Sequence, residues 1–379
     1  MSKLQELIKE LCPDGVEFKK LGEVCKIMNG KDYKHLNNGI YPVYGSGGIM
    51  NYVDNFVYDK PSVLLPRKGS IGNVFYVDSP FWTVDTIYWT RINTNFIIPK
   101  FLYYYIKTQN LEGKNTAIGA VPSLTQSVLN KIEIPLPPLE VQSEIVRILD
   151  TFTAHTAELQ AELQAELQAR KEQYEYYRNK LLTFDENDER VKWIKLGEIG
   201  NTCMCKRIMK HQTSDIGEVP FFKIGTFGKE ADAFISYELY DEYKNKYSFP
   251  RKGEILISAS GTIGRTVIYD GQDAYFQDSN IIWIQNDESK VLNKYLYYYY
   301  QIIEWNVEGG TIKRLYNTNL SKTIIAYPPL SEQKRIISIL DKFESLVNDL
   351  SEGLPAEIAA VQEQYEYYRN KLLTFKRKS

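Results

Sequence analysis

The chain has 379 residues, of which 43% are hydrophobic and 25% are charged, and its formal net charge is −2. These proportions are typical of globular proteins and exclude a collagen-like or intrinsically disordered chain. No apolar run approaches the ~18 residues that a membrane-spanning helix needs. Residues 1–15 begin with alternating charged and apolar side chains, which predict an amphipathic helix rather than a signal peptide, so we expect a cytoplasmic protein without a membrane partner.

Residues 16–134 contain short strand-like runs, such as Ser62–Leu65 and Asn73–Val77, separated by Gly, Asn, Asp and Pro. We expect a β-rich α+β domain with one helix after Pro99, which carries the tyrosine run Tyr103–Tyr105. The domain has 13 Lys and Arg against 9 Asp and Glu. This positive balance favours contact with a polyanion.

Residues 135–190 have the pattern of a long helical spacer. The proline pair Pro137-Pro138 marks a boundary, and apolar residues then recur three and four apart. Residues 156–169, TAELQAELQAELQA, are strong helix formers, so we predict a continuous helix from about Leu139 to Phe184. The spacer has 6 Lys and Arg against 12 Asp and Glu, so the negative charge of the chain is concentrated there.

The second half of the chain repeats the first. The sequence EQYEYYRNKLLTF occurs at Glu172–Phe184 and again at Glu363–Phe375. Residues 191–328 predict a second β-rich domain, with strands at Ile255–Ser258, Thr266–Tyr269 and Ile281–Ile284 and a helix after Leu292. Residues 329–379 predict a second helical spacer, which Ser351–Pro355 should break or kink.

Several segments resemble the specificity subunit of type I restriction–modification enzymes. They are LCPDGVEFKKLGEV at 11–24, PLPPLEVQSEIVRILD at 135–150, YPPLSEQKRIISILD at 327–341, and two G-[ST]-I-G turns at 69–72 and 261–264. The resemblance implies an α+β fold of two β-rich target-recognition domains. Two long helices would separate them as an antiparallel coiled coil, with a pseudo-two-fold internal repeat.

The same resemblance implies a non-catalytic subunit that reads a bipartite, gapped site in double-stranded DNA. It would dock two methyltransferase subunits and, through them, restriction/translocase subunits. This chain would hold no cofactor, whereas S-adenosylmethionine, ATP and Mg would serve the partner subunits. An alternative from another class is a non-catalytic two-fold adaptor that holds two copies of a protein partner. The diverged β-rich domains and the charge distribution favour DNA recognition.

Candidate DNA-binding residues are hydrogen-bonding side chains in turn-like segments, because such side chains read base edges and phosphates. In the first domain these are Lys31, Tyr33, Lys34, Tyr44, Ser46, Arg67, Lys68, Ser70, Asn73 and Lys114. In the second they are Lys206, Arg207, Lys210, Lys223, Ser260, Thr262, Arg265, Lys313 and Arg314. For each, the alternative is a solvated surface side chain, and for the glycine turns a plain β-turn.

The repeated helices supply candidate partner-docking residues, because identical sequence indicates identical contacts. These are Gln142, Tyr174, Tyr177 and Arg178 with their second copies Gln333, Tyr365, Tyr368 and Arg369. For the tyrosines and arginines of the repeated peptide, to which Tyr176 and Tyr367 also belong, pairing of the two helices is the alternative role. The tyrosine runs Tyr103–Tyr105 and Tyr297–Tyr300 are expected to pack in the core or an interface rather than to stack on bases.

No sequence motif predicts a catalytic or metal site. Asp14, Glu17 and Lys19 superficially match a nuclease pattern, but they lie too close together to occupy two adjacent strands, and we expect a turn before a strand there. Cys203 and Cys205 have His211 nearby but lack a second ligand pair at zinc spacing.

Overall fold

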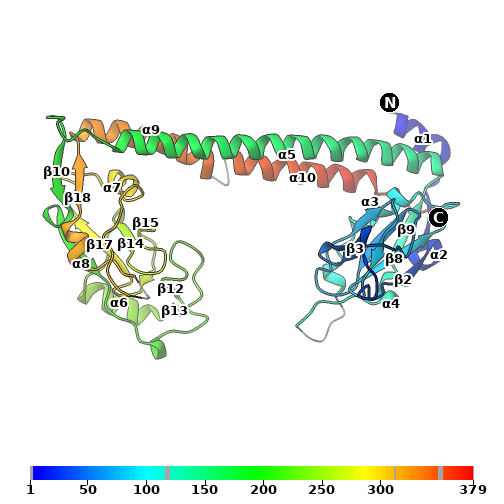
Figure 1. Ribbon diagram of the computed structural model, residues 1–379, viewed down its shortest axis with the longest axis horizontal. Coiled ribbons are helices and arrows are strands. Elements are labelled where there is room, and N and C mark those ends of the chain that lie inside the picture. The colour runs from blue at the N-terminus through cyan, green and yellow to red at the C-terminus, as the bar shows by residue number, and fades with distance from the viewer. Residues whose placement is uncertain (1–2, 116–119, 311–312, 349–352, 379) are drawn as a thin grey trace. The chain divides into compact units, whose positions relative to one another are not determined.

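The computed structural model describes residues 3–115, 120–310, 313–348 and 353–378. They form two compact units, of which unit 1 comprises Met1–Leu163 with Ile358–Ser379 and unit 2 comprises Gln164–Glu357 (Figure 1). Each unit contains one β-rich domain and a pair of helices. The long helix α5 (Leu139–Leu182) belongs to unit 1 in its first part and to unit 2 in its second.

The β-rich domain of unit 1, called the first domain below, matches the predicted strand-rich region closely. Its elements, with the N-terminal helix, are α1 (Lys3–Leu11), β1 (Glu17–Lys20), α2 (Leu21–Val24), β2 (Cys25–Asn29), β3 (Asn38–Gly45), β4 (Gly48–Val53), β5 (Ser62–Pro66), β6 (Phe75–Val77), β7 (Trp82–Thr83), β8 (Ile87–Ile92), α3 (Pro99–Ile106), η1 (Glu112–Lys114), α4 (Gln126–Leu129) and β9 (Glu133–Leu136). They build sheets in the orders β2-β8-β5-β6, β4-β3-β7 and β1-β9.

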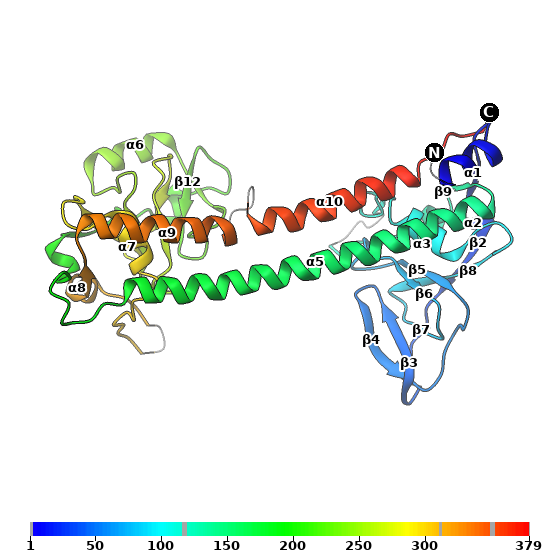
Figure 2. The ribbon, with the colours of Figure 1, turned by 90° about the horizontal axis from the view of Figure 1, so that it is seen from above.

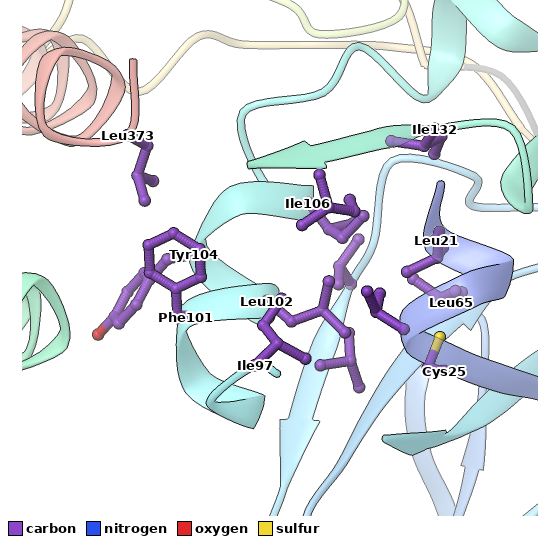
Figure 3. Close-up of a cluster of buried hydrophobic side chains, with 14 of the residues drawn as sticks. Leu21, Cys25, Leu65, Ile97, Phe101, Leu102, Tyr104, Ile106, Ile132 and Leu373 are labelled. Atoms are coloured by element: carbon purple, nitrogen blue, oxygen red, sulfur yellow. The ribbon is translucent and has the colours of Figure 1, made fainter. Parts of the chain in front are cut away.

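The core of the first domain lies where α3 covers the sheet that contains β5. All five residues of β5 are buried, which is why its sequence is a continuous run rather than an alternating one. Figure 3 shows Leu65 of β5 in the same buried cluster as Leu102 and Ile106 of α3. Leu373, beyond the end of α10 (Leu354–Leu372), joins this cluster beside Phe101, so the C-terminal helix is anchored to the first domain.

Unit 2 contains the second domain and repeats this arrangement. Its elements are β10 (Lys192–Lys195), η2 (Leu196–Glu198), β11 (Gly200–Met204), η3 (Lys210–Gln212), β12 (Val219–Phe222), β13 (Phe234–Ile235), α6 (Tyr237–Lys246), β14 (Ile255–Ser258), β15 (Thr266–Ile268), β16 (Tyr275–Phe276), β17 (Ile281–Asn286), α7 (Asn293–Tyr299), α8 (Asn317–Lys322), β18 (Ile324–Tyr327) and α9 (Leu330–Asn348). The sheet orders β11-β17-β14-β15, β13-β12-β16 and β10-β18 correspond strand by strand to those of the first domain.

Even the exceptional pairing recurs: β3 pairs with β7 in parallel, and β12 pairs with β16 in parallel. The repeat predicted from sequence is therefore a repeat of the fold, in which α6 is an addition of the second domain. The two tyrosine-carrying helices are α3 and α7, as predicted. Tyr104, Tyr295 and Tyr298 are buried in them, which confirms their role in packing.

Helix pairs in each unit are antiparallel. In unit 1, α5 runs beside α10 (Figure 2). Phe152 of α5 packs against Tyr368 of α10, and the Thr153 hydroxyl bonds the Tyr365 hydroxyl at 2.9 Å. In unit 2, Tyr177 of α5 stacks on Phe343 of α9 with ring centroids 5.5 Å apart. The two ring pairs are formed by corresponding residues of the repeat.

The second spacer is interrupted, as predicted. Helix α9 ends at Asn348 and α10 begins at Leu354, with Pro355 in its first turn, where proline is compatible with a helix. Ser351 and Glu352 lie outside the described residues. The first spacer, by contrast, is the uninterrupted 44-residue helix α5.

A buried glutamine fixes the start of each long helix. Gln142 accepts from Ile98 N at 2.8 Å and donates to the carbonyls of Phe96 and Pro137 at 2.9 and 2.8 Å. Gln333 makes the corresponding bonds with Leu292 N, Lys290 O and Pro328 O at 2.8, 2.9 and 2.8 Å. Both side chains are fully buried. This corrects the prediction that these glutamines dock a partner, because their amides are satisfied inside the chain.

Replacing Gln142 by Ala should therefore destabilise unit 1. The change leaves one amide and two carbonyls without a partner at a buried site, at a cost of about 2–4 kcal/mol. The midpoint of urea unfolding should fall for Gln142→Ala and remain close to wild type for Gln164→Ala on the exposed surface of α5. Equal midpoints for the two variants would contradict this role.

Candidate nucleic-acid interface

Three loops of the first domain meet at one place. The β5–β6 loop, residues 67–74, contains the first glycine turn. The segment before α4 is bound to this loop, because Leu124 N donates to Arg67 O at 2.9 Å and Gly69 N donates to Pro122 O at 3.0 Å. The turn between β3 and β4 joins them, because Asn73 Nδ2 donates to Ser46 O at 2.9 Å. Gly69 has φ +83°, which is strained for any residue with a side chain.

The second domain brings the corresponding three loops together. Leu315 N donates to Ala259 O at 2.9 Å, which links the segment before α8 to the β14–β15 loop. The β14–β15 loop contains the second glycine turn, in which Gly261 has φ +66°. A Cβ at Gly261 would lie 3.6 Å from Ile224, which follows β12, just as one at Gly69 would lie 3.2 Å from Ser46, which follows β3.

The side chains on these loops have diverged although the backbone arrangement is retained. Ser46 of the first domain corresponds in place to Ile224 of the second. The segment before α4 has Pro122 and Ser123, whereas the segment before α8 has Lys313 and Arg314. Two surfaces with the same scaffold and different hydrogen-bonding groups are suited to reading two different sequences.

Most predicted residues of the first domain are at least partly accessible to solvent. Lys68, Ser70, Asn73 and Lys114 are exposed, and Ser46 and Arg67 are half-buried. Lys114 belongs to η1, where Glu112 lies against Gly72 of the same glycine turn. Arg67 donates to Asp85 O at 3.0 Å, which holds its guanidinium at the loop.

The other predicted residues of the first domain are placed differently. Tyr44 packs against Phe75 and Phe81, and burial raises the pKa of its hydroxyl, so its ring serves the core. Lys31 and Lys34 are exposed on the β2–β3 connection with half-buried Tyr33 between them. Lys31 N bonds Thr83 O at 2.8 Å, which ties this segment to β7 rather than to the glycine turn.

In the second domain several predicted cations have partners in the protein. Arg207 pairs with Asp278 at 2.9 Å and Lys223 with Asp232 at 2.8 Å. Arg265 Nη1 donates to Phe227 O at 2.9 Å, and Arg314 donates to Ser279 O. Lys206, Lys210, Thr262 and Lys313 are exposed, and Ser260 is half-buried and donates to Asn280 Oδ1 at 2.9 Å.

The described residues contain no group of three His, Cys, Asp or Glu that could hold a metal ion. Burial raises the pKa of the Cys205 thiol to about 12, which disfavours the thiolate that a metal needs. Pro13 and Asp14 form a turn immediately before β1, as expected of a false nuclease motif. None of the helices in the described parts of the chain is long and apolar enough to cross a membrane.

The repeated helical peptide presents a second surface, and the structure changes which residues define it. Tyr174 is buried, its hydroxyl donates to Gln301 at 3.2 Å, and burial raises its pKa to about 12. Arg178 also donates to Gln301, and Arg369 is 7% exposed. Tyr365 bonds Thr153. These predicted docking residues are therefore used largely inside their own units.

Exposed aromatic rings lie next to them. Tyr176 is 59% exposed and Tyr367 is 60% exposed, and each packs edge-on against Tyr177 or Tyr368, with ring centroids 5.2 Å apart. We call these two pairs the tyrosine patches. Tyr176 and Tyr367 are among the tyrosines that the sequence assigned to helix pairing or partner docking, and helical spacing places them away from the Tyr174 face.

A family model described as the type I restriction modification DNA specificity domain matches residues 13–169 and 188–360. The two matches follow the two halves of the repeat and cover most of the chain. The chain belongs to this specificity family. It is thus a DNA sequence-recognition subunit within a type I restriction–modification system, and the adaptor alternative is not favoured.

Individual relatives of this specificity subunit support the same family assignment. A Haemophilus influenzae protein described as a type I restriction enzyme specificity subunit is 51% identical over 95% of this chain and 96% of the relative. The EcoR124I/EcoR124II specificity subunit of Escherichia coli is 29% identical over 99% of this chain and 98% of the relative.

Solved structures show the same fold. A chain from a study of complex assembly and conformational transition of the type I R-M system has a TM-score of 0.68 and 18% identity, over 95% of this chain and 98% of that chain. The crystal structure of the HsdS subunit from Thermoanaerobacter tengcongensis has a TM-score of 0.53 and 18% identity, over 96% and 97%.

In this specificity subunit, Lys68 lies in the β5–β6 loop of the first domain and Lys313 in the segment before α8 of the second, and both are exposed. If each contacts a phosphate, Lys68→Ala and Lys313→Ala should weaken binding to all DNA sequences alike. Each should also reduce the slope of log Kd against log salt by about 1. The measurement is fluorescence anisotropy of labelled DNA bound by the purified restriction–modification complex. Lys171→Ala, an exposed lysine of α5, is the control, and an equal effect there would point to general charge instead.

Proposed function

We propose that this chain reads a bipartite, gapped site in double-stranded DNA, with each domain reading one half. The observation that carries the proposal is the three-loop arrangement, which occurs twice with different side chains. The backbone bond from Leu124 N to Arg67 O in the first domain recurs from Leu315 N to Ala259 O in the second. An adaptor for two copies of one protein would need the same side chains at both places. Near-identical helices and diverged loops instead suit one constant partner and two different half-sites.

The constant partner in this proposal is a methyltransferase subunit, bound once at each tyrosine patch. Restriction/translocase subunits would join through it, and the assembly would act on chromosomal DNA in the cytoplasm. S-adenosylmethionine, ATP and Mg would then belong to those partners, and this chain would have no catalytic step of its own. Exposed tyrosine is suited to such a surface, because its ring supplies a large contact area at a small cost in side-chain entropy.

The proposal is tested by single-molecule methylation sequencing of DNA from cells that produce this chain with its methyltransferase subunit. A two-part, gapped motif should occur with this chain and be lost without it. Exchange of residues 191–328 for the corresponding domain of a relative should change one half only. Absence of methylation by an intact, purified complex, or a change in both halves after the exchange, would contradict the proposal.

The helical repeat should set the gap of the motif. Deletion of Gln160–Leu163 shortens α5 by ~6 Å at 1.5 Å per residue. B-DNA rises ~3.4 Å per base pair, so the gap should change by about one to two base pairs while both halves are retained. Replacing the same four residues by four alanines keeps the length and should leave the gap unchanged. An altered half-site in the deletion would rule out this role.

Each tyrosine patch should account for one methyltransferase subunit. Tyr176→Ala with Tyr177→Ala should lower the number of bound subunits from two to one, and adding Tyr367→Ala and Tyr368→Ala should lower it to none. Mass photometry of the purified complexes measures this directly. Tyr237→Ala, which removes a tyrosine that is 50% exposed on α6, is the matched control. Two subunits on the fourfold variant would place docking elsewhere.

A further inference from the structure

The first domain has a two-stranded ribbon whose end is apolar and exposed. Strands β3 and β4 pair antiparallel, with Gly45 opposite Gly48 and Tyr44 opposite Ile49 at the turn (Figure 2). In the sheet order β4-β3-β7, β4 is the edge strand. A Cβ added at Gly47 or Gly48 would meet no atom within 4 Å, so the turn extends into open space.

Two large apolar side chains follow this turn directly. Ile49 is 49% exposed and Met50 is 56% exposed. The register shifts between Val43 and Tyr44, opposite this part of β4, and such a bulge redirects the side chains beside it. Apolar residues that are exposed on a protein surface are ordinarily single and scattered. Two adjacent large apolar residues exposed at a glycine-rich tip are instead typical of a contact surface.

The apolar tip is joined to the basic glycine turn. Ser46 in the tip accepts from Asn73 at 2.9 Å, and a Cβ at Gly69 would lie 3.2 Å from Ser46 Oγ. Arg67 and Lys68 immediately precede Gly69, so the loop that is joined to the apolar tip carries two cationic side chains. A surface for a purely apolar protein partner would not need these cations, whereas a DNA surface needs both phosphate and base contacts.

We propose that the β3–β4 ribbon enters the major groove of one half-site, where Ile49 and Met50 contact thymine methyl groups. The major groove of B-DNA accepts a two-stranded ribbon, and the methyl group of thymine is its only apolar feature. This inference rests on the proposed DNA recognition and adds the bases that the first domain distinguishes. The contacted thymine belongs to an A·T pair within or beside that half-site.

The second domain differs at this place, as two readers of different sequences should. The residues after β12 are Lys223 and Ile224, of which Lys223 is paired with Asp232 and Ile224 is half-buried. Ile224 N donates to Gln277 Oε1 at 2.9 Å. The thymine contact is therefore specific to the half-site that the first domain reads.

The test replaces each thymine of the recognised DNA, within and beside both half-sites, by deoxyuridine, which removes only the methyl group. Binding is measured with the full chain in complex with its methyltransferase subunits. At one or more positions in the first domain's half, the wild-type Kd should rise about three- to tenfold. Ile49→Ala with Met50→Ala should weaken binding to the unmodified site by a similar factor and abolish the difference between thymine and deoxyuridine.

Ile40→Ala is the matched control, because Ile40 is 78% exposed near the other end of the same ribbon, and this variant should behave as wild type. No methyl-sensitive position in that half, or the same sensitivity in the double variant, would overturn the inference while leaving DNA recognition intact. Loss of methyltransferase subunits from the double variant with unchanged DNA affinity would assign the ribbon to a protein contact. Failure of the wild-type complex to bind any specific site would overturn the proposed function itself.

Discussion

Each recognition domain depends on the buried junction where it meets its helix. The amides of Gln142 and Gln333 each bridge the proline pair and the strand-to-helix connection of the adjoining domain. About two helical turns after each glutamine, an aspartate of the same helix completes the junction. Lys100 and the Tyr104 hydroxyl reach Asp150 at 2.8 and 2.7 Å, and Lys294 and Tyr298 reach Asp341 in the same way.

This junction is directional, which a purely apolar contact would not be. Hydrogen bonds require defined angles as well as distances, so a domain held by them has one favoured orientation on its helix. Apolar packing of α3 or α7 supplies the buried contact area between the domain and its helix. The buried polar groups then select one orientation of the domain among those that would bury a similar area. Because the loops with the candidate DNA-binding residues belong to the same domain, their orientation relative to the helix is set at this point.

Sequence reasoning predicted the repeat, the long helix, the strands and the two glycine turns, because these follow from local pattern. It did not predict which face of the repeated peptide is exposed. Tyr174 and Tyr176 have the same side chain and lie two residues apart. Only the position of α7 and α9 decides that Tyr174 is buried while Tyr176 is exposed. The same limit applies to Gln142, whose polar side chain indicates a surface residue until its three buried partners are known.

The loop clusters illustrate a further limit. Ser46 and Arg67 are far apart in sequence, and both are bound by Thr86, which accepts from Ser46 N at 3.2 Å and from Arg67 N at 3.0 Å. No short sequence pattern reports such a non-local contact. The candidate residues could be listed from composition, but the structure was needed to separate Tyr44, which packs in the core, from Lys68, which is exposed. Residue type alone selects groups able to bind DNA, whereas strand topology selects those that share one surface.

The charges indicate how a chain with a formal net charge of −2 can be selective. Sequence-independent affinity for DNA comes from unpaired cations that displace counterions. In the second domain Arg207 and Lys223 are paired with carboxylates of their own domain, which reduces that contribution. Each cation paired in this way contributes less to binding of any phosphate backbone, so contacts to base edges have more weight. Discrimination then improves at the expense of total affinity, and in the proposed bipartite reading two domains on one chain would restore that affinity by binding the same DNA together.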